Sequence, residues 1–208
     1  MIQPLFSMIV FTIVFGNLAK IDSNGVPYAI FSFTALVPWT YFSGALASSS
    51  GSLLGASGMM TKVYFPRLII PMAPVLSKLI DFAIALILLA GMMVYYGFTP
   101  SIDIIYFPSL IILMILTASG MGMWLTALSI QYRDINYGLG FLIQLLMYLA
   151  PVVYPASNVP EHFRLLYGCF SMAGVIEGFR SILLKTNPMP WDLIGVGSIV
   201  ACLLFISG

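Results

Sequence analysis

Charged residues are so rare in this chain that they divide it into long uncharged stretches. Only 7% of the 208 residues are charged and 61% are hydrophobic, whereas about 25% of an average soluble domain is charged. A helix needs about 20 apolar residues to cross the hydrocarbon core of a bilayer. Six uncharged stretches approach or exceed that length: 1–19, 23–61, 82–102, 104–132, 135–160 and 193–208. We therefore expect an all-α, polytopic membrane protein with six transmembrane helices in a single transmembrane domain.

Turn-forming and polar residues refine the limits of these spans. Asn24-Gly25 and Pro27 mark a short connection, because asparagine, glycine and proline favour turns. We expect a longer loop at about 52–74 and the longest polar segment at about 155–190. The expected spans are 2–18, 28–50, 76–96, 105–129, 136–154 and 191–207.

The distribution of lysine and arginine predicts the orientation. Cytoplasmic loops of membrane proteins carry an excess of these residues. Lys62, Arg67 and Lys78 lie in or beside the second loop and Arg133 lies in the fourth, whereas the first loop has only Lys20. The final loop carries three basic residues on the other side, which weakens this assignment without reversing it. We expect both ends of the chain in the cytoplasm.

Residues that would carry enzymatic chemistry are scarce. The sequence has no GxxxxGK[ST] phosphate loop, so ATP hydrolysis by that route is excluded. His162 is the single histidine, and Cys169 and Cys202 fit no metal-binding spacing. A net charge of +1 offers no basic surface to nucleic acid. Neither paired carboxylates nor a nucleophile with its base is visible. We expect a non-catalytic protein without cofactor, metal or nucleic-acid partner.

One ion pair is expected within the apolar part of the chain. Lys78 and Asp81 are three positions apart at the start of the expected third span, a spacing that brings side chains together on a helix. They are interpreted as an interfacial pair in which Lys78 reaches the headgroups. The alternative, a proton relay, requires further acids and histidines deeper in the membrane.

Small and aromatic residues indicate packing surfaces and a path for substrate. Small residues four apart let helix backbones approach each other, either within a subunit or between subunits. Two such stripes are Gly44, Ser48 and Ser52, and Ala47, Gly51 and Gly55. Most aromatic side chains are expected in the core or at the membrane interfaces. A minority can stack on sugar rings, and the candidates for a glycan path are Phe11, Phe15, Trp39 and Tyr41.

Four motifs, in order along the chain, resemble one family of transporters. They are KVYFPRLIIP at 62–71, QYRDI at 131–135, PVVYP at 151–155 and SMAGVIEGFR at 171–180. Together they resemble the permease subunits of ABC type-2 exporters, and most closely the branch that exports polysaccharide, O-antigen or teichoic acid. The resemblance begins at Ile2-Gln3-Pro4-Leu5 and extends to the last span.

This resemblance implies a homodimer of six-span subunits in the bacterial inner membrane, working with two separate ATPase subunits. A coupling helix in the loop at about 52–74 would rest on the ATPase. Plain anchoring by positive charge is the alternative for Lys62 and Arg67, and helix capping is the alternative for Asp134. The residues expected to couple to the ATPase are Lys62, Tyr64, Phe65, Arg67, Arg133 and Asp134.

The resemblance also implies an extracytoplasmic gate at about 155–180. Tyr154, Glu177 and Arg180 are its candidate residues, and Glu177 and Arg180 are spaced to pair on one helix. Because no amphipathic helix precedes the first span and no basic tail follows the last, we expect a chain trimmed at both ends.

The implied function is the membrane half of an ATP-driven exporter of a lipid-linked polysaccharide of the O-antigen, capsule or teichoic-acid type. An ABC type-2 exporter of another substrate, such as a drug or lipid, is the first alternative. A secondary transporter is the second, and it would require buried acids or broken helices at mid-membrane. A membrane-embedded enzyme would need a convergent polar cluster.

Overall fold

The computed structural model describes residues 2–18, 25–55, 68–132, 134–156 and 167–208. Within these ranges every regular element is a helix. In chain order they are α1 (Ile2–Phe11), the π-helical turn η1 (Thr12–Leu18), α2 (Tyr28–Ser50), α3 (Ser52–Gly55), α5 (Ile69–Tyr96), the 3-10 helix η2 (Ile102–Tyr106), α6 (Phe107–Gln131), α7 (Asp134–Leu149), α9 (Ser171–Leu184) and α10 (Trp191–Ser207).

Three of the described helical stretches are long and apolar enough to cross a bilayer: Tyr28–Ser50, Ile69–Tyr96 and Ile102–Gln131. Pro4–Gly16 and Trp191–Ser207 are shorter apolar helices. These features confirm the all-α, multi-span architecture that the sequence predicts, while the count of six spans stays a prediction.

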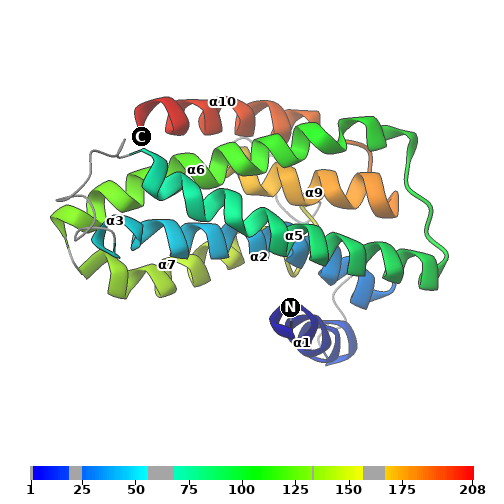
Figure 1. Ribbon diagram of the computed structural model, residues 1–208. Helices are drawn as coiled ribbons and strands as arrows, with labels where there is room; N and C mark the ends of the chain where they lie inside the picture. Colours follow the sequence, from blue (N-terminus) through cyan, green and yellow to red (C-terminus); the bar gives the residue numbers. More distant parts are fainter. Residues whose placement is uncertain (1, 19–24, 56–67, 133, 157–166) are drawn as a thin grey trace.

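α2 is the central helix, with α5, α6 and α9 packed around it (Figure 1). Its apolar residues are spread around the helix and not gathered on one side, and Ile30, Phe33, Phe42 and Leu46 on its different faces are fully shielded from solvent. A helix that is hydrophobic all round is stable only when other helices or lipid surround it. The apolar surroundings that α2 needs are supplied by the helices packed around it.

The helix formed by α1 and η1 has a different direction from the rest of the bundle. Figure 1 shows α1 nearly end-on, whereas α2, α5, α6 and α10 run across the view. α1 and η1 pack against α2 and leave Phe6 and Ile9 of α1 and Ile13 of η1 exposed. The expected first span at 2–18 is thus helical, but it crosses the other helices steeply.

The third helix begins earlier than the sequence predicted. α5 starts at Ile69, seven residues before the expected position 76, so the expected loop at 52–74 overlaps α5 at its end and α3 at its beginning. Pro71 lies in the first turn of α5, where a backbone N–H has no helical partner in any case. Pro74, one turn later, removes a single hydrogen bond without ending the helix.

Hydroxyl groups connect α2 to its neighbours at the end where α2 stops. Ser49 Oγ donates to the carbonyl of Pro71 at 2.9 Å. Thr126 Oγ1 donates to the carbonyl of Ser49 at 2.9 Å, and Ser129 Oγ donates to that of Ser50 at 2.8 Å. Such bonds between apolar helices satisfy polar groups that lipid would leave unpaired. They hold α2, α5 and α6 in register.

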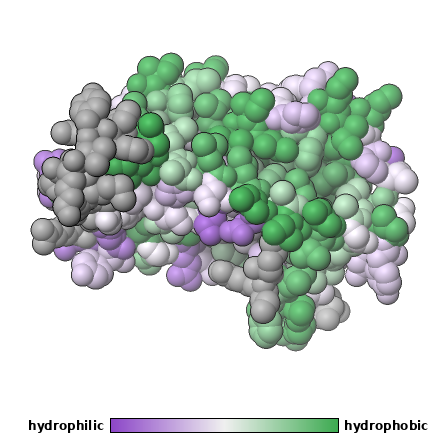
Figure 2. Space-filling view, in the orientation of Figure 1, coloured by the Kyte–Doolittle hydropathy of each residue, from purple (hydrophilic) through white to green (hydrophobic). Residues whose placement is uncertain are grey.

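Much of the outer surface is apolar, as a lipid-facing surface requires (Figure 2). Ile80, Ile87 and Val94 are exposed along α5, and Ile199 and Leu203 along α10. A soluble monomer rarely exposes apolar surface over so wide an area. The protein is a multi-pass membrane protein by this criterion as well.

Among the glycines that the structure describes, Gly120 lies nearest to the backbone of another helix, and it is outside the two small-residue stripes that the sequence indicated. A Cβ atom at Gly120 would lie 2.9 Å from backbone atoms of Leu204 and Phe205 in α10. In the stripes, Gly44 faces the Lys78 side chain, whereas a Cβ atom at Gly51 would meet nothing within 4 Å.

We predict that Gly120→Leu separates α6 from α10 and destabilises the fold. Overpacking of this kind costs about 1–3 kcal/mol, so the midpoint of thermal unfolding in detergent should fall. The matched control is Gly91→Leu, because a Cβ atom there meets nothing within 4 Å. Equal shifts for the two variants would contradict the close approach of α6 and α10.

Candidate functional site

The three residues expected at the extracytoplasmic gate are brought together around the guanidinium of Arg180. Arg180 is fully buried in α9. Its Nη1 donates to Glu177 Oε1 at 3.1 Å and to the carbonyl of Tyr154 at 3.1 Å, and its Nη2 donates to the carbonyl of Val152 at 2.9 Å. The predicted pairing of Glu177 with Arg180 is therefore confirmed.

Further contacts attach the segment 152–156, which follows α7, to both α9 and α2. Glu177 Oε1 also accepts a hydrogen bond from the Ala156 N–H at 2.9 Å. Tyr28 Oη, at the start of α2, donates to the carbonyl of Val153 at 2.8 Å. The Phe31 ring centroid lies 3.7 Å from Arg180 Cζ, which is close enough for a cation–π interaction. The start of α2, the end of α7 and α9 thus form one polar cluster.

Tyr167 extends this cluster beside Tyr154. Its hydroxyl donates to Tyr154 Oη at 3.4 Å. Burial raises the pKa of Tyr167, and the hydrogen bond to Tyr154 raises it further. The phenol therefore stays protonated near neutral pH and acts as a hydrogen-bond donor.

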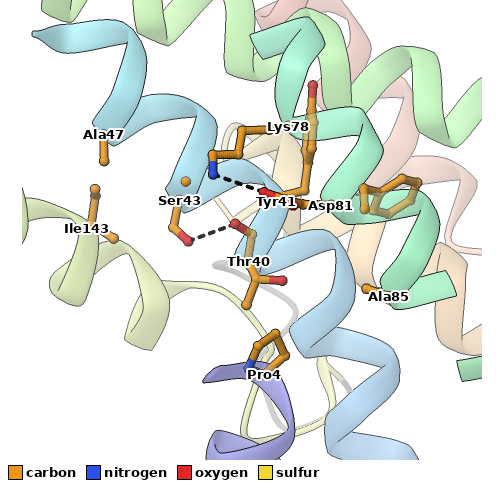
Figure 3. Close-up of a pocket in the computed structure, with 11 residues that line it drawn as sticks. Pro4, Thr40, Tyr41, Ser43, Ala47, Lys78, Asp81, Ala85 and Ile143 are labelled. Carbon is orange, nitrogen blue, oxygen red and sulfur yellow. Dashed lines mark hydrogen bonds and ion pairs between the residues drawn. The ribbon is translucent and has the colours of Figure 1, made fainter. Parts of the chain in front are cut away.

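A second polar site lies on another face of α2, in a pocket of about 410 Å³ (Figure 3). Four helices line it: α1 through Pro4, α2 through Tyr41 and Ser43, α5 through Lys78 and Asp81, and α7 through Ile143. Lys78 Nζ donates to Asp81 Oδ2 at 3.0 Å, so the predicted ion pair is confirmed.

The helix that carries this ion pair begins well before it, whereas its place at the start of the third span stays a prediction. Lys78 is the tenth residue of α5 because the helix begins at Ile69. At about 1.5 Å per residue, Lys78 and Asp81 lie about 14 and 18 Å along a helix about 42 Å long. The pair is therefore well inside the helix.

The four aromatic residues proposed for a glycan path have different environments. Tyr41 lines the pocket, and its hydroxyl donates to the carbonyl of Val75 at 3.2 Å. Trp39 is buried against Phe42 in the core, with ring centroids 5.6 Å apart. Phe11 and Phe15 are half-buried and contact each other edge to face. Of the four, only Tyr41 lines this pocket.

Most of the residues expected to couple to an ATPase lie outside the described residues: Lys62, Tyr64, Phe65, Arg67 and Arg133. Asp134 is the first residue of α7 and is exposed. Among the described residues, no group of three or more histidine, cysteine, aspartate or glutamate side chains is placed to hold a metal ion.

Several residues of both sites were not identified from the sequence. Tyr28 and Tyr167 belong to the Arg180 cluster, and Thr40 and Ser43 belong to the pocket. Thr40, Ser43 and Gly44 share one face of α2, because residues three and four apart are neighbours on a helix. This polar face lies opposite Lys78, and its spacing in the sequence could have indicated the pocket.

We predict that Arg180→Met destabilises the fold strongly. Removing one partner of a buried ion pair costs about 3–5 kcal/mol, because it leaves the other charge uncompensated. The midpoint of thermal unfolding in detergent should therefore fall. Lys185→Met removes an exposed positive charge whose ammonium donates to Thr99, and it should change stability by about 0.5 kcal/mol or less.

A double-mutant cycle separates the ion pair from simple packing. Glu177→Gln combined with Arg180→Met should cost less than the sum of the two single changes, because neither charge remains. Additive effects would show that the two side chains stabilise the fold independently.

The sequence also matches a family of membrane transporters and several of its members. Residues 1–184 match the family described as ABC-2 type transporter. The O-antigen export system permease protein RfbA of Myxococcus xanthus is 24% identical over 188 residues, which are 90% of this chain and 66% of that protein.

Two proteins of Klebsiella pneumoniae that carry the same name are each 23% identical to this chain. One is matched over 88% of this chain and 70% of its own length. The other is matched over 99% of this chain and 79% of its own length.

Proposed function

Because the chain belongs to the ABC-2 type transporter family, we propose that it is the membrane permease subunit of an ATP-driven exporter of a lipid-linked polysaccharide. The substrate would be of the O-antigen, capsule or teichoic-acid type. One observation carries this proposal: relatives named O-antigen export permease proteins match 88–99% of this chain. The all-helical bundle with an apolar outer surface supports it.

The proposed subunit works as a homodimer with two separate ATPase subunits in the bacterial inner membrane. The sequence supports a separate ATPase, because the chain has no phosphate loop. Its six spans would leave both ends and the residues around 52–74 in the cytoplasm, as the distribution of lysine and arginine predicts.

Within this proposal, the Arg180 cluster is the extracytoplasmic gate. The guanidinium bonds to the carbonyls of Val152 and Tyr154, so α9 and the end of α7 move as one unit while these bonds persist. Tyr28 connects the same unit to α2. Opening the gate would require either a joint movement of these elements or loss of the bonds.

The first test is genetic. Removing the gene for this chain from its source cell should abolish surface polysaccharide and leave lipid-linked glycan inside the cell, and the wild-type gene should restore export. The measurement is surface glycan by antibody or lectin binding, together with glycolipid extracted from spheroplasts. Normal surface glycan in the deletion strain would contradict the proposal.

The second test concerns coupling. Phe65→Ala should reduce both export and recovery of the ATPase subunit, because truncation of an aromatic seated in a partner's groove costs about 2 kcal/mol or more. Tyr95→Ala is the matched control, since Tyr95 is an exposed aromatic at the opposite end of α5 from that loop. Normal export and normal recovery of the ATPase from Phe65→Ala would move the coupling role to other residues.

A further inference from the structure

Lys78 and Asp81 place two opposite charges near the middle of an otherwise apolar helix. Lys78 is the tenth and Asp81 the thirteenth of the 28 residues of α5, and a hydrocarbon core about 30 Å thick covers about 20 residues of a helix. If the bilayer is centred on α5, both residues lie within that core. Charged residues within spans face a bundle interior or a water-filled cavity and mark substrate pathways.

The pair is not buried in protein. The Lys78 side chain is 36% exposed and the Asp81 side chain is 61% exposed. Both line the pocket between α1, α2, α5 and α7 (Figure 3). On the face of the molecule in Figure 2, a small hydrophilic patch interrupts the hydrophobic surface near its middle. The pocket therefore offers the two charges a place for water or a polar ligand.

The polar atoms of this pocket include both donors and acceptors. Lys78 Nζ has three N–H groups and uses one of them for Asp81. Thr40 Oγ1 donates to the carbonyl of Leu36 and Ser43 Oγ donates to that of Thr40, so both hydroxyl oxygens still have lone pairs to accept with.

The remaining walls are apolar. Tyr41 and Phe82 contribute aromatic rings, and Ala85 and Ile143 contribute aliphatic surface. A volume of about 410 Å³ lies within the range of about 300–1,000 Å³ that is typical of small-ligand sites. A ring with hydroxyl groups at its edge and C–H groups on its faces matches such a surface.

We propose that this pocket binds a sugar ring of the exported glycan in preference to the anionic headgroup of its lipid carrier. The inference rests on the proposed function. Lys78 and Asp81 are the charged residues that line the pocket, and their charges cancel. A phosphate placed beside Lys78 would also lie beside the Asp81 carboxylate, which repels it. Sugar hydroxyls donate to the carboxylate and accept from the ammonium, so both charges contribute to binding.

The test measures the accessibility of Ser43, which is half-buried and lines the pocket. Ser43→Cys is introduced into a chain whose Cys169 and Cys202 are replaced by serine, and membrane vesicles containing the intact exporter are treated with a charged methanethiosulfonate reagent. We expect labelling, because a thiolate forms only in contact with water. The control is Ile80→Cys, at the same depth on α5 but exposed outside the pocket, which should remain unlabelled.

Protection identifies the ligand. Vesicles supplied with glycolipid from glycan-producing cells, at about ten times its Kd, should label about tenfold more slowly at Ser43→Cys. Extract from cells unable to make the glycan, and added phosphatidic acid, should leave the rate unchanged. Equal protection by phosphatidic acid would overturn the preference for sugar. Absence of labelling would show that lipid or a second copy fills the pocket, and it would also overturn the inference.

Export assays separate this inference from the proposed function. Asp81→Asn should lower the export rate about tenfold, the effect expected from losing one charged hydrogen bond, whereas Asp103→Asn, outside the pocket, should not. If the wild-type chain fails to restore export, the proposed function fails. If the wild-type chain exports normally and glycolipid gives no protection at Ser43→Cys, only this inference fails.

Discussion

A guanidinium without solvent contact organises the end of the bundle where α2, α7 and α9 meet. Arg180 is fully buried, and its bonds to Glu177, Val152 and Tyr154 offset part of the free energy lost when it leaves water. A buried charge persists only when its partners are fixed, because removal of one partner leaves the other uncompensated. The position of the segment after α7 therefore depends on α9, and the start of α2 is joined to both through Tyr28.

The ion pairs Glu177–Arg180 and Lys78–Asp81 differ in the way that their proposed roles require. Glu177 and Arg180 are shielded and joined to backbone groups on other elements, as suits a gate that opens only as a unit. Lys78 and Asp81 have the same spacing on their helix, yet their side chains face a pocket. The spacing of two residues on a helix is enough to bring their charges together. The surrounding helices determine whether the pair is buried and joins other elements or stays accessible in a pocket.

The sequence predicts the helical architecture well, because charges and turn residues mark the ends of apolar runs. It placed α10 at the residues where the structure has it, and it paired Glu177 with Arg180 by spacing. It did not predict the early start of α5 at Ile69, because prolines such as Pro71 and Pro74 are typical of loops, although a helix tolerates them near its beginning. The contacts of Tyr28 with Val153, 125 residues away, depend on tertiary packing that no local pattern contains.

In the proposed function, this chain forms the membrane path of an ATP-driven glycan exporter. The most direct measurement is transport in vesicles that contain the purified chain, its ATPase subunit and the lipid-linked glycan. A membrane-impermeant lectin or glycosidase then reports how much glycan reaches the compartment opposite the ATPase. Glycan should appear there only when ATP is added and only when both subunits are present. Transfer without ATP, or ATP-driven transfer by the ATPase in vesicles that lack this chain, would contradict it.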